Sequence, residues 1–167
     1  MLHRFGVSLA ILSLAALAAC DAQTPDSADA AQATQDIPQG LTQFDSPHAV
    51  AATMDRLEAA VQERGFKVFA RIDHAAGAAS VDMTLRPTQL LIFGNPQGGT
   101  PLMRNAQSMG IDLPLKALVY EDADGQVRVA FNDPAFLADR HDMANAAQIA
   151  DRMGGLLDTL GKAATGA

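Results

Sequence analysis

Several polar side chains in this chain could do acid–base chemistry. Asp73 and His74 stand together at the end of a segment of alternating apolar residues, while Glu121 and His141 lie further along the chain. Imidazole gains and loses a proton near neutral pH, so a histidine beside a carboxylate can act as a general acid or base. If folding brings these groups together, they form a His–carboxylate site. The alternatives are a capping aspartate, hydrogen-bonded histidines and turn acids.

A glycine-rich segment is the second candidate site. It follows an apolar run and precedes a predicted helix, so backbone N–H groups and a positive helix end could hold an anion there. It is not a phosphate-binding P-loop, because no lysine precedes Thr100 and the glycine spacing is one residue short. The alternative is a tight strand-to-helix turn. The candidate ligand-binding residues in this segment are Gly94, Asn95, Gly98, Gly99 and Thr100.

Arg86 is a further candidate, either for an anionic ligand or for a structural ion pair with Asp73 or Glu121. The histidines show no HxH or HxxxH spacing, and the methionines form no MxxM cluster. We therefore expect no metal and no cofactor. No Ser/His/Asp order stands out, and the sequence identifies no catalytic residue.

Hydrophobic periodicity predicts the elements that position these residues. Strands are expected at 41–45, 66–73, 88–93, 115–121 and 126–132, and helices at 46–64, 100–109, 133–141 and 143–160. Residues 94–99 are expected to form a loop, and 75–82 either a short helix or a loop. The apolar run at 90–93 suits a central strand covered on both faces. Together these elements predict an α/β (α+β) two-layer sandwich, with a mixed sheet and helices packed on one face.

The N-terminus predicts export and a membrane anchor. Its apolar run is about 13 residues long, whereas a spanning helix needs about 20, so residues 1–19 fit a signal peptide. The run ends Leu17-Ala18-Ala19-Cys20, which resembles the lipobox of bacterial lipoproteins. The alternative is an ordinary secretory signal with a chance cysteine. We expect lipidation at Cys20, an acidic linker over 20–40, one domain over 41–167, and a location in the bacterial cell envelope, facing the periplasm or exterior.

Several short motifs stand in order over about 41–143. They are residues 72–74, 85–88, 93–96, 99–100, 102–103, 112–116, 121–122, Gly125 and 140–141. Taken together, these motifs resemble the domain-of-unknown-function 302 family. The resemblance implies a small α/β domain that is often dimeric and whose biochemical activity is not established.

Charge and motifs leave three functional hypotheses. The formal net charge of −7 and the scattered basic residues exclude a nucleic-acid partner. The leading hypothesis is a membrane-tethered, non-enzymatic module that binds a small ligand or an envelope protein and forms a homodimer. The alternative is an enzyme in which His74, with Asp73 or Glu121, acts on a small anion held at 94–100. A third hypothesis is a stress-related envelope protein with protein partners.

Overall fold

The structure is a computed structural model, and it describes residues 37–167. The predicted signal peptide, Cys20 and most of the predicted linker lie outside the described residues. None of the helices in 37–167 is both long and apolar enough to cross a membrane.

The described part is built on a five-stranded sheet. Its strands are β1 (Leu41–Ser46), β2 (Lys67–Asp73), β3 (Thr88–Gly94), β4 (Leu115–Glu121) and β5 (Val127–Asn132), in the order β1-β5-β4-β3-β2. All neighbouring strands pair antiparallel. The predicted α+β class is confirmed, but the sheet is antiparallel rather than mixed. The reason is that β2, β3, β4 and β5 are consecutive in the chain and adjacent in the sheet, so each connection between them reverses the chain direction. Only the connection from β1 to β2 crosses from one edge of the sheet to the other.

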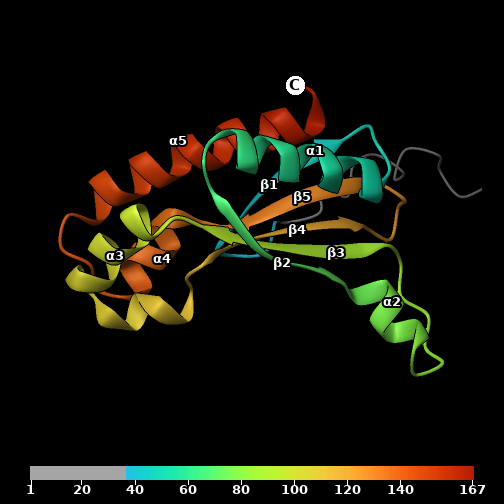
Figure 1. Ribbon diagram of the computed structural model, residues 1–167, viewed down its shortest axis with the longest axis horizontal. Coiled ribbons are helices and arrows are strands. Elements are labelled where there is room, and N and C mark those ends of the chain that lie inside the picture. The colour runs from blue at the N-terminus through green and yellow to red at the C-terminus, as the bar shows by residue number, and fades with distance from the viewer. Residues whose placement is uncertain (1–36) are drawn as a thin grey trace, which may run out of the picture. The chain divides into compact units, whose positions relative to one another are not determined.

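Two helices, α1 (Val50–Glu63) and α5 (Ala146–Thr165), cover one face of the sheet (Figure 1). The short helix α2 (His74–Ala79) projects from one end. The helices α3 (Pro96–Asn105) and α4 (Pro134–Arg140) lie at the other end with the 3₁₀ helix η1 (Gln107–Ile111). The two ends of the sheet are therefore built from different elements.

The main core lies between the sheet and this pair of helices. Val50, Met54, Leu57 and Val61 follow one another at spacings of four, three and four residues, and they lie on the buried face of α1. Opposite them lie buried strand residues, and the Phe44 and Phe131 rings meet edge to face at 6.1 Å. A fully buried leucine contributes about 1.5–3 kcal/mol through the area it removes from water. This core holds the sheet flat against α1 and α5.

Strand β3 departs from the expectation of a strand buried on both faces. Leu91 and Phe93 are fully buried toward the helices, whereas Leu90 and Ile92 are half-buried on the other face. The helices cover only one side of the sheet, so the apolar run has one open side.

Candidate functional site

A cavity of about 530 Å³ opens between α3, the residues 113–115 that lead into β4, and α5. Its volume falls within the usual range for small-ligand sites. Most of its wall is apolar, and the polar side chains that line it belong to Asn95, Gln97, Thr100 and Arg152. The apolar wall includes Phe66, Phe69, Leu102, Leu113, Pro114, Met153 and Leu156.

The start of α3 explains how one wall of the cavity forms. Asn95 is the N-cap, its side chain accepts a hydrogen bond from Gln97 N at 2.8 Å, and Pro96 is the first helical residue. The predicted loop at 94–99 and the predicted helix start at Thr100 are therefore wrong. The Asn-Pro start outweighs the low helix propensity of Gly98 and Gly99.

Gly94 permits a close approach at the base of the cavity. A Cβ added there would lie 3.3 Å from Pro114 Cβ and 3.4 Å from the Phe69 ring. The Leu113–Pro114 peptide bond is cis. A side chain at position 94 would push the β3–β4 connection outward.

All five candidates from the glycine-rich segment line the cavity, but their backbone does not present an anion site. Gln97 N donates to the Asn95 side chain, and the N–H groups of Gly98 and Gly99 each donate to the Asn95 carbonyl at 3.0 Å. Pro96 has no N–H. The first-turn donors are thus already used, and the segment is the capped strand-to-helix turn of the alternative prediction.

The charged side chain in the wall is Arg152, on α5. It makes no hydrogen bond or ion pair with any residue in 37–167. Guanidinium carries five donors and stays charged. The cavity therefore combines an apolar wall with one cation that has no partner in the described part of the chain.

The other predicted residues lie at the opposite end of β3. Asp73 pairs in register with Gln89, whereas Gly94 pairs with Lys67. At roughly 3.3 Å per residue, the five steps from 89 to 94 separate them by about 16 Å. His74 therefore does not form a site with the glycine-rich segment within one chain, because acid–base catalysis needs hydrogen-bond reach or one bridging water.

At that end the candidates have structural contacts. Asp73 caps α2 by accepting from Ala76 N at 2.9 Å, and His74 is exposed in the first turn of α2. Arg86 Nε donates to the backbone oxygen of Glu121 at 3.0 Å. Among the described residues, Arg86 makes no ion pair with Asp73 or Glu121, so the ion-pair alternative for Arg86 is not observed. The capping role of Asp73 matches the structural alternative.

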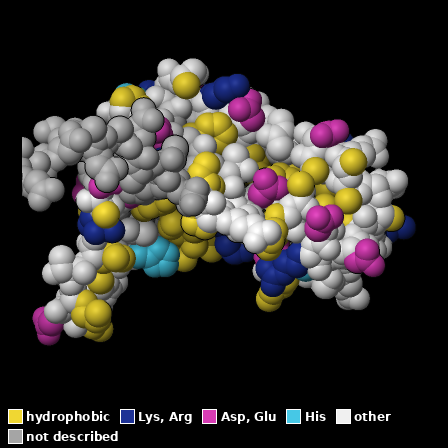
Figure 2. Space-filling model, turned by 180° about the vertical axis from the view of Figure 1, so that it is seen from behind, with side chains coloured by type: hydrophobic (Ala, Val, Ile, Leu, Met, Phe, Trp, Pro, Cys, Tyr) yellow, Lys and Arg dark blue, Asp and Glu magenta, His cyan; other side chains and the backbone are white. Residues whose placement is uncertain are grey.

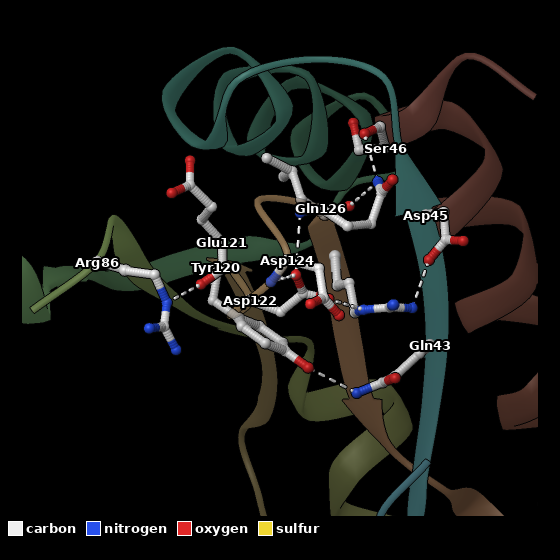
Figure 3. A network of polar contacts seen from close by, with 11 residues as sticks. Gln43, Asp45, Ser46, Arg86, Tyr120, Glu121, Asp122, Asp124 and Gln126 are labelled. Carbon is white, nitrogen blue, oxygen red and sulfur yellow. Dashed lines mark hydrogen bonds and ion pairs between the residues drawn. The ribbon is translucent and has the colours of Figure 1, made fainter. Parts of the chain in front are cut away.

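The β4–β5 hairpin carries a network of polar contacts (Figure 3). The buried Asp122 carboxylate accepts from Arg128 Nε at 2.6 Å and from the N–H groups of Asp124 and Gln126. The hydrogen bond from Arg128 holds the pKa of Asp122 below its ordinary value, and the same bond raises the pKa of Arg128. Arg128 also pairs with Asp45 at 2.7 Å. These acids stabilise the turn.

His141 belongs to a cluster that sequence reasoning missed. Its Nε2 lies 2.6 Å from Asp112 Oδ2 and its Nδ1 lies 2.9 Å from Ser108 Oγ. Arg140 Nη1 lies 3.2 Å from Asp112 Oδ1. Asp112 and His141 stand 29 residues apart, so no local spacing could show the contact; their only signal was that both lie in motifs of the family resemblance. No group of three or more His, Cys, Asp or Glu within 37–167 could hold a metal ion.

Comparison with solved structures agrees with this fold. The chain is similar to a protein whose structure is titled "Crystal structure of uncharacterized conserved protein DUF302 from Bacillus stearothermophilus". The TM-score is 0.68 at 20% identity, covering 75% of this chain and 98% of that one. At this identity the likeness shows the fold alone.

The chain also resembles part of two larger curated proteins. It is 46% identical over 114 residues to "Fluoride-specific ion channel FluC 1" of Brucella suis and to "Fluoride-specific ion channel FluC 2" of Brucella melitensis. The match covers 68% of this chain but only 45% and 42% of those proteins. The chain thus spans less than half the length of these relatives.

A family profile covers most of the chain. The family described as "Domain of unknown function DUF302" matches residues 42–160, which include all five strands except Leu41, and all of the cavity wall. The chain therefore belongs to the DUF302 family.

Proposed function

We propose that this protein is a membrane-tethered module of the cell envelope that binds an elongated apolar ligand with one anionic group, without chemistry on that ligand. The observation that carries the proposal is the apolar cavity with Arg152, which has no hydrogen-bond or ion-pair partner within 37–167, in its wall. Apolar walls with a few oriented polar groups are the usual composition of small-ligand sites.

The lining defines the ligand class. Aromatic and aliphatic side chains from β2, the β3–β4 connection and α5 favour a hydrocarbon body. Arg152 supplies a guanidinium for a carboxylate, sulfate or phosphate. Phe69 and Met103 are 49% and 36% exposed, so the apolar wall continues to the surface. An alkyl carboxylate fits both requirements.

Two observations support the membrane tether. The residues Leu17-Ala18-Ala19-Cys20 have the types that lipoprotein processing needs. The same domain also forms part of proteins described as fluoride-specific ion channels. Because those proteins share less than half of their length with this chain, channel activity is not part of the proposal.

A homodimer through the open face of the sheet is part of the proposal. Ile72, Leu90, Leu118 and Ala130 are paired across four neighbouring strands, so they form an apolar row on the face opposite α1 and α5. Hydrophobic side chains also gather on the projection that contains α2 (Figure 2), where Val81 and Met83 are 63% and 66% exposed. Sedimentation of the protein with and without a Leu118→Glu substitution tests this; equal masses would contradict it.

Calorimetric titration with hexanoate, octanoate, decanoate and dodecanoate tests the ligand class. Each added methylene should tighten binding about fourfold, from about 0.8 kcal/mol per buried methylene, until the cavity is full. Arg152→Gln should weaken binding roughly tenfold, from the loss of a hydrogen bond to a charged group worth about 1.5 kcal/mol.

Arg104→Gln is the matched control. Arg104 is exposed on α3, does not line the cavity, and makes no bond with the described residues, so the substitution changes the net charge equally. If binding weakens equally in both variants, the effect of Arg152 comes from the net charge of the protein and not from a direct contact with the ligand. The absence of any dependence on chain length would contradict the apolar site.

A further inference from the structure

Ser108, His141 and Asp112 form a continuous hydrogen-bonded chain outside the cavity wall. Ser108 lies in η1, Asp112 is the residue that follows η1, and His141 is the C-cap of α4. The two bonds to the imidazole, at 2.9 and 2.6 Å, use both ring nitrogens. The same three residue types activate serine nucleophiles in unrelated folds, where the serine bonds Nε2 and the aspartate bonds Nδ1. In this protein the two ring nitrogens are exchanged, with Ser108 at Nδ1 and Asp112 at Nε2.

The bonding pattern assigns the direction of each hydrogen bond. As a carboxylate, Asp112 can only accept, so it fixes the imidazole tautomer with the proton on Nε2. Nδ1 is then an acceptor, and the Ser108 hydroxyl must donate to it. This polarity is what general-base activation of a hydroxyl requires.

The three hydrogen-bonded side chains differ in their exposure to solvent. Ser108 is exposed, whereas the side chains of His141 and Asp112 are only 5% and 11% exposed. Arg140 Nη1 adds a second partner for Asp112. A reactant can reach the hydroxyl, while the base and the group that positions it are screened from water.

We propose that Ser108 is a nucleophile for carboxylic esters, with His141 as the general base and Asp112 as a positioning residue. This activity is separate from ligand binding in the cavity. Ser108 Oγ attacks the ester carbonyl, His141 Nδ1 takes the hydroxyl proton, and the bond to the alkoxy group breaks as that group receives the proton. Water, deprotonated by the same nitrogen, then releases the acid and restores Ser108.

Ile111 indicates the acyl class. In a 3₁₀ helix, side chains three residues apart eclipse one another, so Ser108 and Ile111 lie on the same side of η1. Ile111 is 71% exposed, the largest exposed fraction among the large apolar residues of the described chain. It offers an apolar contact beside the hydroxyl, which favours an aliphatic acyl group.

The first experiment treats the full chain with an alkyl fluorophosphonate and locates the adduct by peptide mass spectrometry. Ser108 Oγ forms the bond to phosphorus as fluoride leaves, and His141 takes the proton. Ser80 is the internal control, because it is also exposed but donates to the Gly77 carbonyl. General-base catalysis contributes about 100-fold or more, so Ser108 should react at least about 100 times faster than Ser80. Equal rates would overturn the proposal.

Substitutions distinguish a catalytic role of these three residues from a purely structural one, in which their hydrogen bonds only hold η1 and α4 together. Ser108→Ala should abolish the adduct and turnover of p-nitrophenyl butyrate, and His141→Gln should lower both about 100-fold. If His141→Gln fails to fold, the ratio of the Ser108 and Ser80 labelling rates in the unaltered protein decides, and a ratio near one would overturn the proposal.

The acyl class has its own test. Ile111→Asn should lower the preference for p-nitrophenyl butyrate over the acetate by several-fold. Turnover that survives Ser108→Ala would assign the activity to another group and overturn the proposal.

Discussion

The two ends of the sheet differ in how their polar groups are satisfied. At the hairpin end, the Asp122 and Asp45 carboxylates both accept hydrogen bonds from Arg128, and Tyr120 accepts from Gln43 at 2.9 Å (Figure 3). At the cavity end the walls are apolar, and the charged group among them is without a partner within 37–167. The polar residues at the hairpin end therefore stabilise the fold, whereas the proposed binding site lies where the sequence is mostly apolar.

The largest expected effect is on the free energy of unfolding, when one leucine of the closed core and one leucine of the cavity wall are each replaced by alanine. Leu57→Ala should lower the free energy of unfolding by about 2–5 kcal/mol, because Leu57 is fully buried and a closed void remains. Leu113→Ala should cost only about 1–2 kcal/mol, since its space joins an existing opening. Urea unfolding of both variants measures the difference, and equal losses would mean that the cavity is not open.

Filling the cavity should separate binding from stability. A Cβ at Gly99 would lie an ordinary 3.5 Å from Leu113 Cδ1, so Gly99→Leu can project into the cavity. We expect decanoate affinity to fall at least about tenfold, while replacement of a helical glycine changes stability by about 1 kcal/mol or less. Gly77→Leu, which meets nothing within 4 Å on α2, is the control. Unchanged affinity in Gly99→Leu would place the ligand elsewhere.

The hairpin network predicts a pH dependence of stability. The pKa of Asp122 is held below its ordinary value of 3.8, so its contribution is fully present above that pH and is lost as pH falls through the lower folded-state value. Thermal unfolding should therefore show a steeper acid loss in the unaltered protein than in Asp122→Asn. Parallel curves would contradict the role of the Arg128 contact.

The smallest effect concerns the cap of α2. Asp73→Ala should cost about 1 kcal/mol or less, because α2 has no buried residues and its loss frays only the projection. Hydrogen exchange should rise at Ala76, whose N–H loses its acceptor, while decanoate affinity stays unchanged. A loss of decanoate affinity in Asp73→Ala would show that the α2 end of the sheet affects the cavity, and it would contradict the difference drawn between the two ends.

Local signals predicted much of the fold. Apolar residues three and four positions apart are typical of α1, alternation of apolar residues predicts β2, and the helix predicted at 133–141 matches α4. The predicted helix start at Thr100 is wrong because the Asn95 cap outweighs the low helix propensity of Gly98 and Gly99.

The candidate site was less accessible to sequence reasoning. The cavity joins residues from β2, the β3–β4 connection and α5, and the Ser108 contact with His141 spans 33 residues. Such contacts depend on tertiary packing, which no periodicity encodes.

The most direct test of the cavity is the change in backbone amide chemical shifts as decanoate is added to the isotope-labelled protein. We predict saturable shifts at Gly98, Gly99 and Leu115, which line the cavity. Shifts confined to Leu118 on the open face, or to Gln126 in the hairpin, would contradict the assignment of the ligand site.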